Sequence, residues 1–295
     1  MPTPPPNVLP ESPQFERRET LVRGVRLSFC EWGKPDARQA SLFIIHGVLA
    51  ASEAFTSFVK ELEPDQHVVA IDLPGNGSSS RFGRAHDGFH GNALLLREFA
   101  REQGLTKAIW LGHSYGGALT LRALIDEPAI MRAAVLMNAA NPFSGRERLV
   151  VRFFLSPLGR AVAGVLPRIP SRLCLLAWKA APGNRKGFDA ARLRPYLDSL
   201  RTSGTIEDVL HMLKSWKESM QALRNDLLKG GHDTPVLLLW GARDFVVPVR
   251  SAKPLLECFQ NARLVVLPGV SHVTNEEAPR QAARLVQEFL DQFTG

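Results

Sequence analysis

The chain has 295 residues, of which 45% are hydrophobic, and it carries a formal net charge of +7. This length and apolar content predict a large core divided between one or two domains. The three cysteines, Cys30, Cys174 and Cys258, are widely spaced. They exclude a disulfide framework and a cysteine-ligated zinc site, so we expect a reducing, cytoplasmic location.

The N-terminus is rich in proline and lacks the apolar h-region of a signal peptide. We therefore expect residues 1–18 to form a disordered or loosely docked tail. No stretch approaches the ~20 apolar residues that a membrane span requires. The longest apolar candidate, residues 149–166, is interrupted by Arg152, Pro157 and Arg160.

Short apolar runs recur along the chain, and helical patterns separate them. Residues 25–33, "VRLSFCEWG", alternate apolar and polar residues, which predicts a half-exposed antiparallel strand. Residues 91–104 have a helical pattern that ends at a glycine. Four more apolar runs end in small or polar residues, as strands buried on both faces of a parallel sheet do: 41–47, 67–75, 107–113 and 133–138.

A basic and mostly helical segment, residues 142–232, interrupts this alternation. It contains 16 Lys or Arg against 7 Asp or Glu, so the rest of the chain is slightly acidic. Strand patterns resume at residues 234–241 and 262–269, and a last helix is expected within residues 276–293. The sequence thus predicts an α/β core, residues 19–141 and 233–295, with a helical insertion.

The positive charge of the insertion has two interpretations. It forms either a solvated basic face or a surface that attracts acidic substrates or anionic lipid through peripheral membrane contact. Under the second interpretation, its arginines lie near a substrate entrance: Arg146, Arg148, Arg152 and Arg160. Nothing resembles a nucleic-acid-binding motif, so we expect no nucleic-acid partner.

Polar residues follow the predicted strands at the edge where an open α/β sheet binds ligands. Among them, Ser114 lies in "GHSYGG", between an apolar run and a helix-forming run. Three nearby glycines, Gly112, Gly116 and Gly117, leave room for a sharp turn with the hydroxyl at its apex. This pattern favours Ser114 as a nucleophile, which then needs a base, an acid and donors to an oxyanion.

Five motifs occur in an order that resembles the α/β-hydrolase superfamily: "HGVLAAS", "DLPGNGSS", "GHSYGG", "GARDFVVP" and "GVSHVTNEEAP". The chain looks like a capped serine hydrolase of the esterase and lipase-like group, over roughly Glu19 to Phe293. The resemblance implies the α/β-hydrolase fold, with a mostly parallel central sheet and helices on both faces. It also implies that residues 142–232 form a helical cap, inserted after the sixth strand.

The resemblance also assigns roles to individual residues. Ser114 becomes the nucleophile, His272 the base and Asp244 the acid, with oxyanion donors at the backbone N–H of Val48 and Tyr115. The alternative positions for the acid are weaker, because Asn138 carries no charge and Asp72 resembles a bracing turn. Among the other histidines, His46 is expected to be structural, His113 to point away from Ser114, and His86 and His90 to be minor rivals.

These residues favour a cofactor-free, metal-free hydrolase of small-molecule carboxylic esters, with a lipid-like or anionic substrate. Carbon–carbon bond hydrolysis, thioester hydrolysis and acyl transfer use the same triad and stay open. A hydrolase-fold receptor for a small ligand is the alternative from another class of protein. Aromatic residues of the insertion are candidates for the substrate pocket or for the packed core of the cap: Phe153, Phe154, Trp178 and Trp216.

Overall fold

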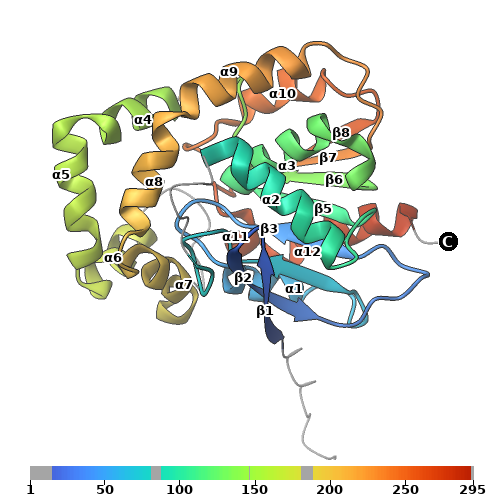
Figure 1. Ribbon diagram of the computed structural model, residues 1–295, viewed down its shortest axis with the longest axis horizontal. Coiled ribbons are helices and arrows are strands. Elements are labelled where there is room, and N and C mark those ends of the chain that lie inside the picture. The colour runs from blue at the N-terminus through green and yellow to red at the C-terminus, as the bar shows by residue number, and fades with distance from the viewer. Residues whose placement is uncertain (1–14, 81–87, 146, 181–188, 294–295) are drawn as a thin grey trace, which may run out of the picture.

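A computed structural model describes residues 15–80, 88–145, 147–180 and 189–293. Within these residues, eight strands form one sheet in the order β1-β2-β4-β3-β5-β6-β7-β8 (Figure 1). The β1–β2 and β2–β4 pairs are antiparallel, and every other neighbouring pair is parallel. The predicted α/β architecture, with its mostly parallel sheet, is therefore confirmed.

Six of the strands coincide with the predicted apolar runs that lie outside the antiparallel edge: β3 (Leu42–Ile45), β4 (Val68–Ile71), β5 (Ile109–His113), β6 (Ala133–Met137), β7 (Val236–Gly241) and β8 (Ala262–Leu267). Their side chains alternate between two hydrophobic cores, one on each face of the sheet. In β3, Phe43 and Ile45 enter one core, and Leu42 and Ile44 enter the other. Strands β3 to β7 are buried on both faces, as the sequence predicts.

The antiparallel edge differs from its prediction. Strand β1 (Glu16–Val22) starts within the segment predicted to be a tail, and it pairs along its whole length with β2 (Val25–Trp32). Strand β2 is mostly buried rather than half-exposed, because helix α2 covers one of its faces. The rings of Phe29 and Phe99 meet edge to face at 5.2 Å on that side.

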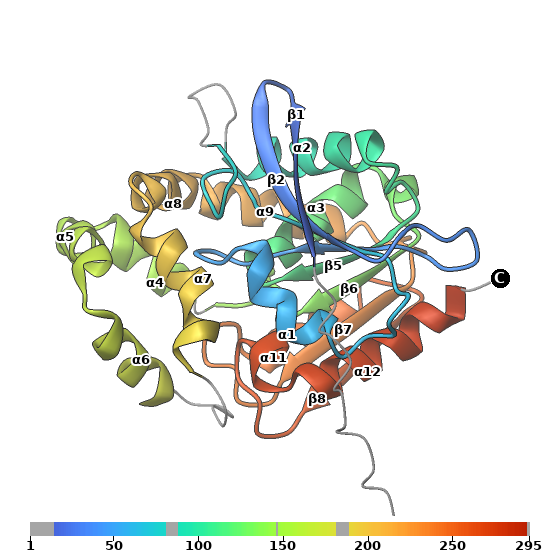
Figure 2. The ribbon, with the colours of Figure 1, turned by 90° about the horizontal axis from the view of Figure 1, so that it is seen from below.

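Helices cover both faces of the sheet (Figure 2). On one face lie α2 (Gly88–Glu102), α3 (Tyr115–Asp126) and α10 (Ala252–Leu256). On the other lie α1 (Thr56–Val59) and α12 (Pro279–Leu290), whose apolar residues enter the second core. Short 3-10 turns complete the core: η1 (Ser52–Phe55), η2 (Pro128–Ile130), η4 (Val249–Ser251) and η5 (Asp291–Phe293).

The elements between β6 and β7 are helical: α4 (Glu147–Leu155), α5 (Pro157–Val165), η3 (Leu166–Arg168), α6 (Ser171–Ala180), α7 (Ala190–Arg201), α8 (Thr205–Lys214) and α9 (Trp216–Leu227). Helices α4 to α8 lie beyond one end of the sheet (Figure 1). Helix α9 instead packs on α3, where buried Arg122 pairs with Asp226 at 2.8 Å. Its Leu223 and Leu227 belong to the core of the sheet, although the sequence places them in the insertion.

Among the described residues, no helix taken singly has the length and apolar character needed to cross a bilayer. Residues Pro157–Arg168 and Ser171–Ala180 meet those criteria only when they are counted together, and they are bent by 114° with respect to each other.

Candidate active site

Ser114 lies at the turn between β5 and α3, with backbone angles φ 51° and ψ −116°. A positive φ is sterically costly for a residue with a side chain, so the surrounding structure has to hold this turn. The Ser114 N–H donates to the Met137 carbonyl at 3.1 Å, and the Ser114 carbonyl accepts from the Ala140 N–H at 2.9 Å. Both contacts tie the turn to the end of β6.

The glycines that follow Ser114 allow the start of α3 to pack closely against neighbouring strand ends. A Cβ at Gly116 would lie 2.1 Å from the Ile45 carbonyl oxygen, and a Cβ at Gly117 would lie 2.3 Å from the Ala139 Cβ. These distances are far below van der Waals contact. The two glycines therefore let the start of α3 approach the ends of β3 and β6, while Ser114 itself takes the unusual backbone conformation.

The structure brings Ser114, His272 and Asp244 into one hydrogen-bonded chain. The Nε2 atom of His272 lies 3.0 Å from Ser114 Oγ, and its Nδ1 atom lies 2.9 Å from Asp244 Oδ2. An unprotonated carboxylate only accepts, which assigns the proton on the neutral ring to Nδ1. Nε2 is then free to accept the proton of the Ser114 hydroxyl, as a general base must.

Asp244 is held by donors on both oxygens of its fully buried carboxylate. Its Oδ1 accepts from the backbone N–H groups of Val246 and Val247, each at 2.8 Å. Its Oδ2 accepts from Asn138 Nδ2 at 2.7 Å, in addition to His272. These contacts fix the carboxylate in the orientation that faces the imidazole.

Asn138 is a site residue whose role the sequence analysis missed. It follows β6 with a positive φ of 47°, and it links the acid to the histidine loop. Besides the bond to Asp244, its Nδ2 donates to the Ser271 carbonyl at 3.2 Å, and its Oδ1 accepts from the Thr274 hydroxyl at 2.6 Å. The only signal in the sequence was its position after a buried strand.

His113 also has a role beyond its expected orientation. Its Nε2 lies 2.9 Å from the backbone carbonyl of His272, which can only accept, so His113 donates there. Burial, followed by the proximity of His272, lowers the pKa of His113 to about 3. A neutral His113 therefore anchors the backbone of His272 beside Ser114.

The backbone N–H groups of Val48 and Tyr115 lie in the two segments next to Ser114. Within the described part of the chain, neither group donates a hydrogen bond. Tyr115 is the first residue of α3, where amide groups are unpaired and the helix dipole is positive. Leu49, which follows Val48, has a positive φ of 58°, so this loop also has a constrained backbone.

His46 controls the direction of the Val48 amide. The Leu73 N–H donates to His46 Nε2 at 3.0 Å, so the Nδ1–H of His46 donates to the Gly47 carbonyl at 2.7 Å. That carbonyl and the Val48 N–H belong to the same planar peptide group and point in opposite directions. Burial lowers the pKa of His46, which favours this neutral form.

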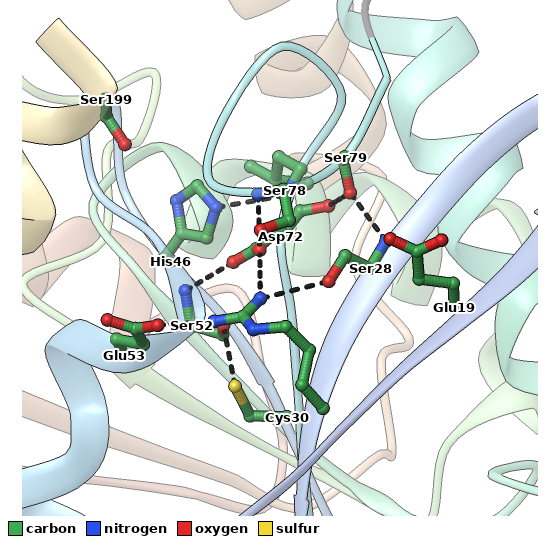
Figure 3. Close-up of polar contacts among 12 residues, drawn as sticks. Glu19, Ser28, Cys30, His46, Ser52, Glu53, Asp72, Ser78, Ser79 and Ser199 are labelled. Carbon is green, nitrogen blue, oxygen red and sulfur yellow. Dashed lines mark hydrogen bonds and ion pairs between the residues drawn. The ribbon is translucent and has the colours of Figure 1, made fainter. Parts of the chain in front are cut away.

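Asp72 braces the loop after Val48 through hydrogen bonds to several segments (Figure 3). Its Oδ1 accepts from the Ser52 N–H at 2.7 Å, at the start of η1. Its Oδ2 accepts from the Ser78 N–H at 2.9 Å and pairs with Arg17 Nη1 at 3.0 Å. Arg17, predicted to belong to the tail, is thus part of the core.

Two cavities adjoin Ser114 and the Val48 loop. The first, of about 310 Å³, is bounded by Ser114 and His272 and lined mainly by residues of α6 and α7: Cys174, Trp178, Leu193, Tyr196, Leu197 and Leu200. The second, of about 530 Å³, is bounded by Val48 and Tyr115 and contains polar residues: Asn76, Asn92, Glu207, Asp208, His211 and Lys214. A strongly apolar cavity and a larger, more polar one that also has apolar walls therefore meet at the Val48 loop.

The predicted pocket residues have different positions. Trp178 lines the apolar cavity, whereas Trp216 packs 5.9 Å from the Tyr115 ring and lines neither cavity beside Ser114. Phe153 and Phe154 pack on each other on α4, 5.2 Å apart, and also lie outside both cavities.

His90 and the entrance arginines whose side chains are described do not line the two cavities. Among the described side chains, Arg152 and Arg160 line neither cavity, and His90 on α2 packs against Phe89. Arg146, His86 and the side chain of Arg148 lie outside the described residues.

Comparison with known proteins identifies relatives with the same fold. The family model of the alpha/beta hydrolase fold matches residues 40–279. The monoacylglycerol lipase abhd6-A of Xenopus laevis is 25% identical over 273 residues, which are 88% of this chain and 77% of that protein. The pimeloyl-[acyl-carrier protein] methyl ester esterase of Yersinia pseudotuberculosis is 23% identical over 256 residues, covering 85% of this chain and 93% of the esterase.

Among solved structures, Cfl2 from Burkholderia cenocepacia superimposes with a TM-score of 0.81 at 21% sequence identity. The superposition covers 95% of this chain and 97% of Cfl2. At this identity, the likeness concerns the fold.

Substitutions of the two buried aspartates, Asp244 and Asp72, should have different effects. Asp244→Asn should lower kcat by ~10⁴-fold while the protein stays folded, because an amide no longer selects the His272 tautomer with an accepting Nε2. Asp72→Asn should instead reduce the free energy of unfolding by about 1–3 kcal/mol, because it disturbs three hydrogen bonds to this buried carboxylate. Kinetics with a soluble ester and denaturant titration measure the two effects, and an inactive but fully stable Asp72→Asn protein would contradict the assignment.

Removal of the Asn138 side chain should weaken the support of Asp244. Asn138→Gly keeps the positive φ accessible, so we expect kcat to fall about 10- to 100-fold with little change in KM, the cost of one hydrogen bond to a charged group. Asn141→Gly, which removes a buried amide bonded to Ala139 and Ser251 instead, is the matched control and should retain kcat. Equal losses in the two variants would mean that Asn138 has only a general structural role.

Proposed function

This chain belongs to the alpha/beta hydrolase fold family, and on that basis we propose that it hydrolyses carboxylic esters through an acyl-enzyme on Ser114. The observation that carries the proposal is the continuous hydrogen-bonded chain from Asp244 through His272 to Ser114. A serine hydroxyl is a weak nucleophile unless a base accepts its proton during attack. His272 is within reach of that proton, and Asp244 holds the ring in the required tautomer.

In the proposed acylation step, Ser114 Oγ attacks the ester carbonyl carbon while His272 Nε2 takes the hydroxyl proton. The negative charge on the carbonyl oxygen is stabilised by the unpaired N–H groups of Val48 and Tyr115. Asp244 stabilises the imidazolium that forms. The tetrahedral intermediate then collapses, and His272 protonates the departing alcohol.

Deacylation repeats these roles with water as the nucleophile. His272 removes a proton from the water as its oxygen attacks the acyl carbon. The same two amides hold the second oxyanion, and the proton returns to Ser114 Oγ as the carboxylic acid leaves. Both proton transfers with Ser114 use His272 Nε2, which lies 3.0 Å from Ser114 Oγ.

The two cavities support a substrate with an apolar and a polar part. We assign the acyl chain to the cavity lined by Trp178, Leu193 and Leu197, because apolar walls favour a hydrocarbon chain. We assign the alcohol part to the polar cavity beside α8, which offers donors and acceptors to hydroxyl groups. Relatives named as a monoacylglycerol lipase and a methyl ester esterase support an ester substrate of this kind.

The first test is sustained turnover. The protein should hydrolyse p-nitrophenyl esters over many cycles, and Ser114→Ala should lose ~10⁴-fold or more in kcat, because the triad acts as a unit. A thioester with the same acyl chain, assayed in parallel, separates thioester hydrolysis from ester hydrolysis. A single slow turnover with a conformational change would favour a ligand receptor, and near-normal activity of Ser114→Ala would contradict the mechanism.

The second test concerns the acyl cavity. Cys174→Phe should fill part of it and lower kcat/KM for an octanoate ester by about tenfold or more, while an acetate ester stays within about threefold, because each displaced methylene costs roughly 1–3 kcal/mol. Leu176→Phe, on the exposed side of the same helix, is the matched control and should leave both substrates unchanged. Equal losses for the two esters in Cys174→Phe would place the acyl chain elsewhere.

A further inference from the structure

Helices α5 and α6 expose apolar side chains to solvent. Leu158, Leu173 and Leu176 have exposed fractions of 68%, 55% and 65%. Val162 and Val165 add to them, and these five residues are called the outer cap residues here. Both helices lie at the outer edge of the molecule in the two ribbon views (Figures 1 and 2).

The exposed residues follow helical spacing, so each helix presents a defined apolar face to solvent. Leu158, Val162 and Val165 lie at positions i, i+4 and i+7 of α5, which share one side of a helix. A different side of α5 is packed, because Ala163 is buried and a Cβ at Gly159 would lie 1.9 Å from the Phe153 carbonyl oxygen. The apolar face of α5 is therefore additional to the face that the fold already buries.

Helix α6 has the same two-sided character. Cys174 and Trp178 line the acyl cavity beside Ser114, whereas Leu173 and Leu176 are exposed on another side of the helix. One helix thus separates the acyl cavity from the outer surface. A surface that covered Leu173 and Leu176 would lie about one helix diameter, ~10 Å, from that cavity.

The charged residues of the segment that carries the outer cap residues all have one sign. Residues 148–188 contain eight Lys or Arg and no Asp or Glu. Five of these basic side chains belong to exposed residues of the described cap: Arg152, Arg160, Arg168, Arg172 and Lys179. A second copy of this chain would bring like charges together on this face, whereas an anionic surface would neutralise them.

Helices that lie in a bilayer interface typically expose apolar side chains that are flanked by basic residues. Each Lys or Arg close to an anionic surface adds to the attraction. Two short helices joined at 114° define a plane, so both can lie flat against a membrane. We propose that the outer cap residues of α5 and α6 dock this protein on the surface of anionic lipid bilayers, with α6 between the lipid and the acyl cavity.

This docking goes beyond ester hydrolysis, because it does not require Ser114. The test is flotation of the full-length protein with vesicles of phosphatidylcholine, either pure or mixed with phosphatidylglycerol, at low and high salt. The protein should float with the mixed vesicles, bind the pure vesicles much more weakly, and dissociate as salt screens the charges. Ser114→Ala should float as the wild type does, so binding is measured independently of catalysis.

Two sets of variants separate the apolar from the electrostatic contribution. The double variant Leu173→Gln/Leu176→Gln should bind about tenfold or more weakly, because two buried leucines are lost from the interface. Arg172→Gln and Lys179→Gln should each cost about fivefold, the effect of one charge near an anionic surface. Leu21→Gln/Leu228→Gln replaces two leucines that are similarly exposed, at 66% and 57%, but lie outside α5 and α6, and it should bind normally.

The unfolding temperature and the hydrolysis of a short soluble ester should be unchanged in the Leu173/Leu176 variant, because neither leucine lines the cavities beside Ser114. Equal binding to the two kinds of vesicle, or normal flotation of that variant, would overturn the proposal. A concentration-dependent dimer that disappears in the variant, without any flotation of the wild type, would assign the face to self-association and would also overturn it.

Discussion

The backbone turn at Ser114 is the constraint on which the candidate site depends. A residue with a side chain pays a steric penalty at φ 51°, so the turn persists only where the surrounding structure holds it. The holding contacts come from the close approach of α3 to β3 and β6, which Gly116 and Gly117 permit. This approach places Ser114 Oγ at the edge of the sheet where the loops after β7 and β8 begin. A side chain at either glycine position would move α3 outward and separate Ser114 from His272.

Three groups of the proposed mechanism, the Val48 amide, His272 and Asp244, are each held by a buried polar residue at the end of a strand. His46 after β3 orients the Val48 amide, His113 in β5 anchors the backbone of His272, and Asn138 after β6 donates to Asp244. These partners lie in a protein interior of low dielectric, where fixed dipoles act more strongly than in water. The parallel sheet thus supplies the reactive groups and their supports at the same edge. The site is preorganised by strand order rather than by any single loop.

Much of this arrangement was predictable from the sequence, for physical reasons. Strands buried on both faces leave continuous apolar runs in the sequence, and strand ends in a parallel sheet meet at one edge. Ser114, Asp244 and His272 could therefore be grouped from the sequence alone. Strand β1 was not predictable, because "ERRETLV" is polar and its strand state depends on pairing with β2 and on the contact of Arg17 with buried Asp72. The bonds of Asn138 and His113 depend on side-chain directions that periodicity does not encode. The predicted cytoplasmic location and lack of a cofactor stay predictions.

The most direct test of the account is the crystal structure of the protein after reaction with an alkyl phosphonate ester, which mimics the tetrahedral intermediate. We predict a covalent bond from Ser114 Oγ to phosphorus, with the phosphoryl oxygen within hydrogen-bond distance of the Val48 and Tyr115 amides. The alkyl chain should occupy the cavity lined by Trp178 and Leu197. A phosphonate attached to another residue, or a phosphoryl oxygen directed away from both amides, would contradict the account.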